Sequence, residues 1–415
     1  MARATASTSA VTFVFITVLL DMVGFGLIIP VLPRLIEDVG HVDLGQAAII
    51  GGWMFFAFAA AQFLFAPIMG SLSDAYGRRP LLLLAVAGLF FDYIFSALAP
   101  TLMWLFVGRV IAGVAGSSYV IANAFIADVT APEHRARAFG LMGAAFGVGF
   151  VIGPAIGGLL GEFGPRVPFW VAAGISAANF IFGWFVLPET LPPAKRRPFN
   201  LKNANPFGTF KVFATYAGVM PLVWVLAVFF FASSVYPAIW PFWGIARFGW
   251  SATTIGLTLA AFGIVAAVTQ GTLSGPLAAR FGEHRVVLAG LVVAVIAAAG
   301  YGLAPGLGVV LVMLLIHAPE GLVHPMLSAL LSRAVPEDAQ GQLQGGLSSV
   351  TNVAMLAGTL FYSQLFGYFM RPDAVVRSPV VSFFVAAAML AVALALFLRI
   401  MRDRRLSALV APVCD

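Results

Sequence analysis

Hydrophobic and polar positions alternate along this chain in long blocks rather than in short periodic patterns. Apolar runs of about 20 residues recur from one end to the other, and each could cross a hydrocarbon core of about 30 Å as a helix. We predict an all-α polytopic membrane protein with twelve transmembrane helices, near 11–33, 48–70, 80–100, 103–127, 137–160, 168–187, 216–240, 253–276, 286–304, 308–331, 343–369 and 379–400.

The composition agrees with this pattern, because 61% of the 415 residues are hydrophobic and only 10% are charged. A soluble protein carries about 25% charged residues. The first apolar run is too long, and too rich in internal Gly and Pro, for a cleaved signal peptide. The single cysteine, Cys414, excludes a disulfide framework and a thiolate metal site. We expect neither a metal nor a cofactor.

The net charge of +6 is informative through its distribution. If both termini are cytoplasmic, most Lys and Arg residues fall on the cytoplasmic side, which agrees with the positive-inside rule for an even number of helices. The exceptions in outer loops are Arg34, Arg166, Arg247, Arg371 and Arg377. The basic residues are spread over short loops and form no groove, which excludes a nucleic-acid partner.

One long polar segment, "PETLPPAKRRPFNLKNANPFGTFK" (188–211), separates two halves of six spans. The halves resemble each other: "GSLSDAYGRR" from Gly70 matches "GPLAARFGEHR" from Gly275, at an offset of 205. Repeated six-helix halves are typical of transporters that alternate access around a midplane site. We predict an N-terminal six-helix bundle (1–187), a cytoplasmic linker (188–215) and a C-terminal six-helix bundle (216–415).

The loop "GSLSDAYGRRP" between spans 2 and 3 is the first candidate motif; its candidate residues are Gly70, Asp74, Gly77, Arg78 and Arg79. The glycines permit close approach of helices and loop, and the carboxylate can bond a helix N-terminus or an Arg across the loop. Taken alone, the segment is equally compatible with a solvated, positively charged loop. In the second half Ala279 replaces Asp74.

Span 4 carries Arg109 about two turns inside its apolar run. A lone charge there costs at least about 2.5 kcal/mol, so it needs a partner or a wet cavity, unless its side chain extends to the outer interface. Span 5 reads "GAAFGVGFVIGPAIGG" and includes Gly153 and Pro154. Small residues at this spacing allow close helix packing, and the proline bends the helix.

These motifs, together with "LLDMVGFGLIIPVLP" (19–33), "FFDYIFSALAPTLMWLFVGRVIAG", "RFGWSATTIGLTLAAFGI" and "SRAVPEDAQGQLQGGLSSVT", resemble the major facilitator superfamily. The likeness is to its twelve-helix drug/proton antiporter branch and specifically to the bacterial tetracycline/proton antiporters. It covers nearly the whole chain.

The resemblance implies two pseudo-symmetric bundles in the bacterial inner membrane that exchange a small-molecule substrate for protons. The proton gradient would drive transport. Spans 1, 4, 7 and 10 would line the cavity, and we expect a monomer in the lipid bilayer. The loop motif, Gly153 and Pro154 would serve conformational gating, and the family's membrane acids in spans 1 and 3 map onto Asp21 and Asp92.

The chain departs from the family pattern in spans 8 and 9. Ala266 stands where the family has a His, although the following Gln270 is kept. Span 9 has no acid, and the expected position is close to Ala294. Because the family uses these sites for proton coupling and substrate binding, the departure favours a substrate other than tetracycline.

Span 10 carries instead "LIHAPEGLVHP" (315–325), where Glu320 lies between His317 and His324. On a regular helix the three side chains project from one face, although Pro319 and Pro325 disturb the register. Burial favours the neutral form of an acid, and His titrates near neutral pH. We hypothesise that Glu320, with His317 or His324, replaces the missing coupling groups, beside Asp21, Asp92 and Arg109. The alternative is a polar cluster that only joins helix 10 to helix 7 or 11.

Other side chains are candidates for the substrate cavity. Tyr236 and Trp240 in span 7 could stack on a flat or cationic ligand, whereas Trp243 and Trp250 fit an interfacial aromatic belt better. Polar candidates are Gln62, Asn123, Gln270, Asn352 and Gln364. Each of these is also explained by a hydrogen bond between helices.

The leading functional hypothesis is proton-coupled efflux of an amphipathic small molecule or drug, with tetracycline-like compounds among the candidates. The alternative is transport of an endogenous metabolite, by uptake or export, on the same fold. A transporter-like receptor is a weaker alternative, because it does not require a buried Glu320 or Arg109. An enzyme is not expected, since the sequence has no phosphate loop, metal-ligand set or nucleophile–base arrangement.

Overall fold

The computed structural model describes residues 2–131, 134–199, 210–336 and 339–403. Within these ranges the regular structure is helical, and twelve helical segments are long and apolar enough to cross a membrane. This confirms the twelve predicted spans. Residues 200–209 of the predicted linker and Cys414 lie outside the described residues, and the cytoplasmic location of the termini stays a prediction.

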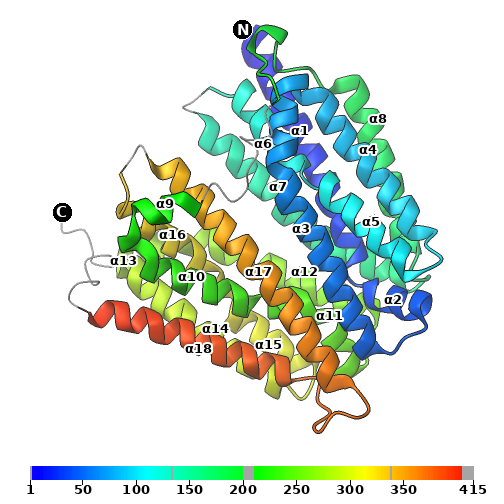
Figure 1. Cartoon of the computed structure of the whole chain (residues 1–415), viewed down its shortest axis with the longest axis vertical. Coiled ribbons are helices and arrows are strands. Elements are labelled where there is room, and N and C mark those ends of the chain that lie inside the picture. Colours follow the sequence, from blue (N-terminus) through cyan, green and yellow to red (C-terminus); the bar gives the residue numbers. More distant parts are fainter. Residues whose placement is uncertain (1, 132–133, 200–209, 337–338, 404–415) are drawn as a thin grey trace. The chain divides into compact units, whose positions relative to one another are not determined.

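The first six spans begin near the N-terminus and end before the polar segment (Figure 1). Their helices are α1 (Ala2–Ile28), α2 (Leu32–Gly40), α3 (Leu44–Tyr76), α4 (Arg78–Ala97), α5 (Leu102–Ala115), α6 (Ser118–Val129), α7 (Arg135–Gly161) and α8 (Val167–Val186). Helix α2 lies between spans 1 and 2, and α5 and α6 together form span 4.

The second six spans follow the short helix α9 (Lys211–Thr215). Their helices are α10 (Met220–Ser233), α11 (Val235–Phe248), α12 (Ala252–Val268), α13 (Ser274–Phe281), α14 (Glu283–Leu303), α15 (Leu307–His317), α16 (Val323–Arg333), α17 (Gln340–Met370) and α18 (Val381–Arg402). Spans 7, 8 and 10 each consist of two helices.

The chain divides into two compact units. Unit 1 comprises Met1–Asp43, Trp53–Pro206 and Trp250–Gly263, and unit 2 comprises Leu44–Gly52, Phe207–Gly249 and Ile264–Asp415. The start of α3 therefore packs with unit 2 and the first part of α12 packs with unit 1. The bundle boundaries at 187 and 216 stay a prediction.

Helix breaks occur at corresponding places in the two halves. In span 4 the break lies at Gly116 and Ser117, and in span 10 a 3-10 turn occupies Ala318–Leu322. Gly116 and Ser117 precede Gly321 and Leu322 by the same offset of 205 that relates the repeated loops. Interrupted helices in both halves agree with a transporter architecture in which non-regular backbone forms binding sites near the midplane.

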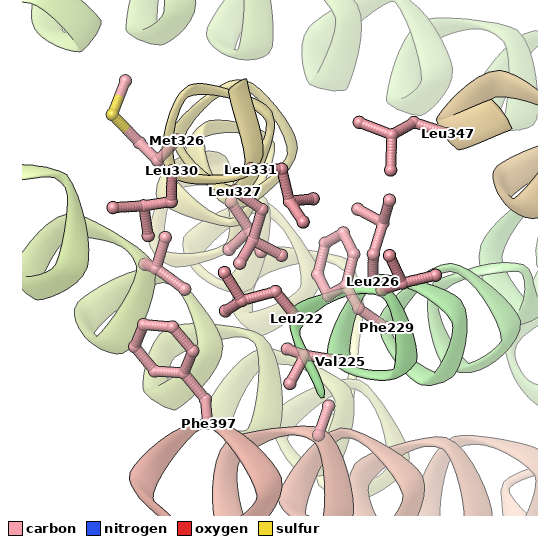
Figure 2. Close-up of a cluster of buried hydrophobic side chains, with 14 of the residues drawn as sticks. Leu222, Val225, Leu226, Phe229, Met326, Leu327, Leu330, Leu331, Leu347 and Phe397 are labelled. Carbon is pink, nitrogen blue, oxygen red and sulfur yellow. The ribbon is translucent and has the colours of Figure 1, made fainter. Parts of the chain in front are cut away.

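A cluster of apolar side chains in unit 2 packs α16, the helix that follows this 3-10 turn, against α10. Figure 2 shows side chains of α10 and α16 meeting between the helices, with others from α17 and α18. The labelled residues are Leu222, Val225, Leu226, Phe229, Met326, Leu327, Leu330, Leu331, Leu347 and Phe397. Because lipid tails are as apolar as these side chains, close packing rather than removal from water holds the helices together in a membrane.

In unit 1 the glycine string of span 5 brings α7 against α1. A Cβ on Gly153 would lie 2.8 Å from the Cα of Gly26, closer than real Cβ contacts allow. Glycine at both positions therefore permits the backbones to touch. Gly143 and Gly147 have no atom within 4 Å of such a Cβ, so the expected close packing holds only for the later part of the string.

Candidate functional site

Unit 1 contains a buried ion pair between spans 3 and 4. Arg109 Nη2 on α5 lies 2.8 Å from Asp92 Oδ2 on α4, and Ser96 Oγ donates to Asp92 Oδ1 at 3.3 Å. Asp92 is fully buried and Arg109 is only 6% exposed. Arg109 therefore has a partner inside the protein and does not extend to the outer interface.

Asp21 on α1 is the second buried acid of unit 1. It accepts hydrogen bonds from Asn179 Nδ2 on α8 at 3.1 Å and from Ser118 Oγ on α6 at 3.2 Å. Among the described residues no Lys, Arg or His pairs with it, although it is only 3% exposed. Neutral donors suit a carboxyl group that can hold a proton, because they do not fix its charge as a guanidinium does.

The two acids of unit 1 line one small cavity. Its volume is about 40 Å³, and its lining includes Asp21, Asp92, Arg109 and Gln62. The space is large enough for a water molecule. The amide of Gln62 donates to the carbonyl of Gly116 at 3.1 Å, so it ties span 2 to the break in span 4. The structure thus brings four of the predicted residues together within unit 1.

Unit 2 contains a different buried pair, on the 3-10 turn of span 10. His317 Nε2 lies 2.7 Å from Glu320 Oε2, and Ser233 Oγ on α10 donates to Glu320 Oε1 at 2.6 Å. His317 is 3% exposed and Glu320 is 5% exposed. A 3-10 turn has about 3.0 residues per turn, so side chains three apart are eclipsed, and this brings the imidazole over the carboxylate.

The second ring nitrogen of His317 is also engaged. Its Nδ1 lies 3.1 Å from Tyr301 Oη on α14, and the ring of Tyr236 on α11 packs on the imidazole with centroids 4.4 Å apart. Ser233 and Tyr301 were not among the predicted site residues. Each is a single hydroxyl in an apolar run, and nothing in the local pattern distinguishes it from other such hydroxyls. We call Ser233, Tyr301, His317 and Glu320 the Glu320 cluster.

His324 does not join this cluster. Its side chain is exposed, and its ring meets Phe230 edge-on with centroids 5.3 Å apart. The reason is helical phase: a 3-10 turn advances about 120° per residue and an α-helix about 100°. Glu320 therefore stays in phase with His317, whereas His324 is rotated by about 80° from Glu320.

The aromatic residues of span 7 pack on the Glu320 cluster. Trp240 meets the ring of Tyr301 at 5.1 Å, and Tyr236 is half-buried beside His317. Trp243 is fully buried and Trp250 is 6% exposed, so the interpretation of both as an interfacial belt is wrong. Belt residues face lipid and water, whereas Trp243 faces Phe383 and Tyr301 inside unit 2.

The remaining polar candidates differ in their surroundings. Gln270 lies on a π-helical turn (Thr269–Leu273), and its Nε2 would be 2.8 Å from a Cβ on Gly321. Because Gly321 has no side chain, the exposed amide of Gln270 lies directly against the turn that carries Glu320. Gln364 donates to the carbonyl of Ile49 at 3.3 Å, which joins helices. Asn123 is half-buried and Asn352 is exposed.

The predicted gating loop forms a charge network around Arg78 in unit 1. Arg78 pairs with Asp74 at 2.6 Å and with Asp128 at 3.0 Å, and its Nη1 donates to Ser73 Oγ at 2.7 Å. Gly77, with φ of 109°, makes the turn into α4. Arg79 instead donates to the carbonyl of Trp184 at 2.7 Å. Asp128, which lies 54 residues after Asp74 in the sequence, was not among the predicted site residues.

The start of the polar segment packs on this loop. Glu189 Oε1 accepts the backbone N–H of Arg78 at 3.0 Å and that of Leu191 at 2.9 Å. Arg197 N donates to the carbonyl of Asp74 at 3.1 Å. A cavity of about 470 Å³ lies here, lined by Asp74, Arg78, Asp128, Leu191, Lys195 and Arg197. The first residues of the predicted linker are therefore part of unit 1 rather than a free tether.

One carboxyl group outside the spans is strongly hydrogen-bonded. Glu162 follows α7 and accepts the backbone N–H of Thr253 at 3.1 Å and its hydroxyl at 2.9 Å. These hydrogen bonds lower the pKa of Glu162 from its ordinary value. The contact attaches the beginning of α12 to the end of α7 within unit 1.

Comparison with known proteins gives one consistent family. A model described as the Major Facilitator Superfamily matches residues 14–359 and 222–412. The tetracycline resistance protein of class C from Escherichia coli is 39% identical over 360 residues, which cover 87% of this chain and 90% of that protein. The class G protein from Vibrio anguillarum is 38% identical over 356 residues, which cover 84% of this chain and 88% of that protein.

Solved structures show the same fold. The human organic anion transporter MFSD10 (TETRAN) superimposes with a TM-score of 0.67 at 25% identity, covering 94% of this chain and 99% of that one. The nucleoside transporter NupG superimposes with a TM-score of 0.73 at 13% identity, covering 95% of this chain and 100% of that one. At that identity the second likeness concerns the fold alone.

Proposed function

Because the chain belongs to the major facilitator superfamily, we propose that it exports an amphipathic small molecule across the bacterial inner membrane in exchange for protons. The tetracycline resistance proteins that it resembles support an exporter. Two six-helix bundles would alternate access to a central site, and the proton gradient would supply the driving force without a cofactor.

The observation that carries the proposal is the buried pair of Glu320 and His317. An acid and an imidazole at 2.7 Å can exist as an ion pair or as two neutral groups, and their total charge changes when one proton is gained or lost. Intramembrane ionisable residues mark proton and substrate pathways. Glu320 and His317 would therefore take up and release the transported proton.

The unit 1 groups have supporting roles in this proposal. Asp21, held by neutral donors beside a small cavity, is a second proton acceptor. The pair of Asp92 and Arg109 holds spans 3 and 4 together next to it. The loop from Gly70 to Arg79, with Gly153 and Pro154 in span 5, serves conformational gating. His324, exposed against Phe230, has no direct role in the coupling pair.

The substrate is proposed to contact the groups around the interrupted helices. Gln270 on the π-helical turn and Tyr236 beside His317 are the first choices, because both adjoin the Glu320 cluster. Trp240 is buried and packs against the ring of Tyr301 in the cluster. Gln62, Asn123, Asn352 and Gln364 complete the candidate set. Ala266 in span 8 and Ala294 in span 9 favour a substrate other than tetracycline.

A second candidate function is transport of an endogenous metabolite on the same fold. The structural likeness to a human organic anion transporter favours keeping this candidate. A receptor without transport is supported least, because signalling does not require a titratable pair inside the membrane. The fold and family are those of transporters, and none of the similar proteins above is named as an enzyme.

The test is expression in a bacterial strain that lacks its major efflux pumps, followed by a compound panel with and without an uncoupler. Resistance that disappears on uncoupling supports export driven by protons. Specific accumulation of a metabolite in place of resistance would support the second candidate. A complete absence of transport in proteoliposomes loaded with the same panel would support the receptor.

The role of Glu320 is tested by Glu320→Gln. We expect proton-driven transport to be lost, while substrate exchange without a gradient remains. The matched control is Glu37→Gln, the same chemical change on α2 outside the spans, which should transport normally. Full coupled transport by Glu320→Gln would contradict the proposed coupling site.

A further inference from the structure

The surroundings of His317 are suited to two protonation states. Its Nε2 faces Glu320 at 2.7 Å and its Nδ1 faces the hydroxyl of Tyr301 at 3.1 Å. A neutral imidazole has one N–H donor and one acceptor nitrogen, whereas an imidazolium has two donors. A buried partner that can only donate, or only accept, would leave one of the two states with an unpaired nitrogen, at a substantial cost.

A phenolic hydroxyl can satisfy both states. It donates its proton to a bare Nδ1, or it accepts from Nδ1–H after the O–H bond has rotated. The ring of Tyr301 is fully buried and held by Trp240 at 5.1 Å and Phe383 at 5.7 Å between centroids. The oxygen therefore stays in place while only its proton turns.

A second hydroxyl lies at the other end of the Glu320 cluster. Ser233 Oγ lies 2.6 Å from Glu320 Oε1. The hydroxyl donates to a carboxylate and can accept from a protonated carboxyl group. A rotatable hydroxyl thus stands at each end of the titratable pair, so a proton can enter, leave or move between Glu320 and His317 without leaving a partner unsatisfied.

The remaining groups that face the pair do not perform this task. Tyr236 presents its ring to the imidazole, and its hydroxyl has no hydrogen-bond partner among the described residues. Within the described part of unit 2 no Lys or Arg pairs with Glu320. Titratable groups that contact His317 are Glu320 from the 3-10 turn, Tyr301 from α14 and Tyr236 from α11.

We infer that Tyr301 and Ser233 are positioning residues that keep the buried Glu320–His317 pair able to gain and lose protons. The inference rests on the proposed coupling function, because it explains how that pair titrates inside the protein. Neither hydroxyl carries the transported proton. Each accommodates the change of charge beside it.

The experiment compares Tyr301→Phe with the unmodified protein in detergent, using the pH titration of the His317 ring protons by NMR, assigned by their loss in His317→Gln. Without the hydroxyl, Nδ1 loses its partner in both protonation states. The hydrogen bond to the charged imidazolium is the stronger of the two, so the midpoint should move to lower pH by about one unit. The pH profile of proton-driven transport should move in the same direction.

The matched control is Tyr362→Phe, which removes a hydroxyl from another fully buried tyrosine of unit 2. Its His317 midpoint should equal that of the unmodified protein. An unchanged midpoint in a folded Tyr301→Phe protein would overturn the inference. Proton-coupled transport that survives in Glu320→Gln would instead overturn the proposed coupling site, so the two failures are distinct.

A second pair of variants keeps the inference testable if Tyr301→Phe does not fold. Ser233→Ala removes the donor to the Glu320 carboxylate, which favours the protonated acid. The part of the transport pH profile that depends on Glu320 should therefore move to higher pH by about one unit. Ser233→Thr keeps the hydroxyl and should restore the original profile. Identical profiles for Ser233→Ala and the unmodified protein would contradict the role of this end of the cluster.

Discussion

The two units place their buried polar pairs in corresponding spans. Asp92 in span 3 meets Arg109 in span 4, and Tyr301 in span 9 meets His317 in span 10. With the offset of 205 between the repeated loops, Tyr301 lies four residues beyond the counterpart of Asp92. His317 lies three residues beyond the counterpart of Arg109, so both members are displaced by about one helical turn.

The difference between the pairs lies in the cation. A guanidinium cannot lose its proton in a protein, so the pair of Asp92 and Arg109 has a fixed cation on regular α-helices. An imidazole can lose its proton near neutral pH, and it stands beside a 3-10 turn that eclipses it with Glu320. Corresponding spans, about one helical turn apart in the repeat, thus supply a permanent anchor in unit 1 and a titratable pair in unit 2.

The repeated loops after spans 2 and 8 show a second difference. Arg78 pairs with Asp128 in unit 1, and Glu283 pairs with Arg333 in unit 2. Both partners are related by the offset of 205, with the charges exchanged. Gly77 and Gly282 make the preceding turns with φ of 109° and 78°. The location of the ion pair is kept in the two halves, while its polarity is reversed.

The largest effect is expected from removal of the fixed cation. Arg109→Leu leaves Asp92 buried without its partner, and we expect a loss of about 3–5 kcal/mol in the free energy of unfolding. Denaturant unfolding in detergent micelles measures it. The double variant Asp92→Asn with Arg109→Leu should recover a large part of the loss. A single variant as stable as the unmodified protein would show that the pair is not an anchor.

A smaller effect is expected when the cation of unit 1 is made titratable. In Arg109→His the cation beside Asp92 could lose its proton, because an imidazole titrates near neutral pH. The stability that the ion pair contributes would be present at low pH, where the imidazole is protonated, and lost as the pH rises. We expect a decrease of about 1–2 kcal/mol between pH 6 and 9, which the unmodified protein should not show to the same extent.

Unfolding curves at several pH values test this variant. Arg109→Lys is the matched control, since an ammonium keeps its charge over this range. If Arg109→His and Arg109→Lys show the same pH dependence, the fixed charge of Arg109 is not what distinguishes the two units.

The smallest effect is expected in the loop pairs. The side chain of Arg78 is 9% exposed and that of Arg333 is 39% exposed. Asp128→Ala should therefore cost more, about 1–2 kcal/mol, than Glu283→Ala, which removes a partner from a more exposed Arg and should cost about 0–1 kcal/mol. Thermal unfolding of the two variants ranks them. The double variant Glu283→Arg with Arg333→Glu exchanges the two charges and should unfold at the same temperature as the unmodified protein. A much lower unfolding temperature would mean that the position of each charge in this pair matters.

The sequence was sufficient where the signal is local to the chain. Apolar runs of the right length predict the twelve spans, because crossing a bilayer requires one such run per helix. The pairing of His317 with Glu320 depends on residues three apart, and both side chains are chemically conspicuous in an apolar segment. The ends of spans were less accurate: α1 ends at Ile28 rather than near 33, because Pro30 and Pro33 interrupt regular helix at this end.

Only the tertiary structure identified the partners of these groups. Ser233, Tyr301 and Asn179 are neutral and lie on other spans than the acids and the imidazole that they contact, so no periodicity marks them. Partner choice depends on how each helix is rotated about its axis, and packing against neighbouring helices sets that rotation. The same packing buries Trp243 and Trp250, and the 3-10 turn rotates His324 away from Glu320. The sequence by itself determined which spans hold charge, whereas the rotation of the helices decided which of those charges meet a partner.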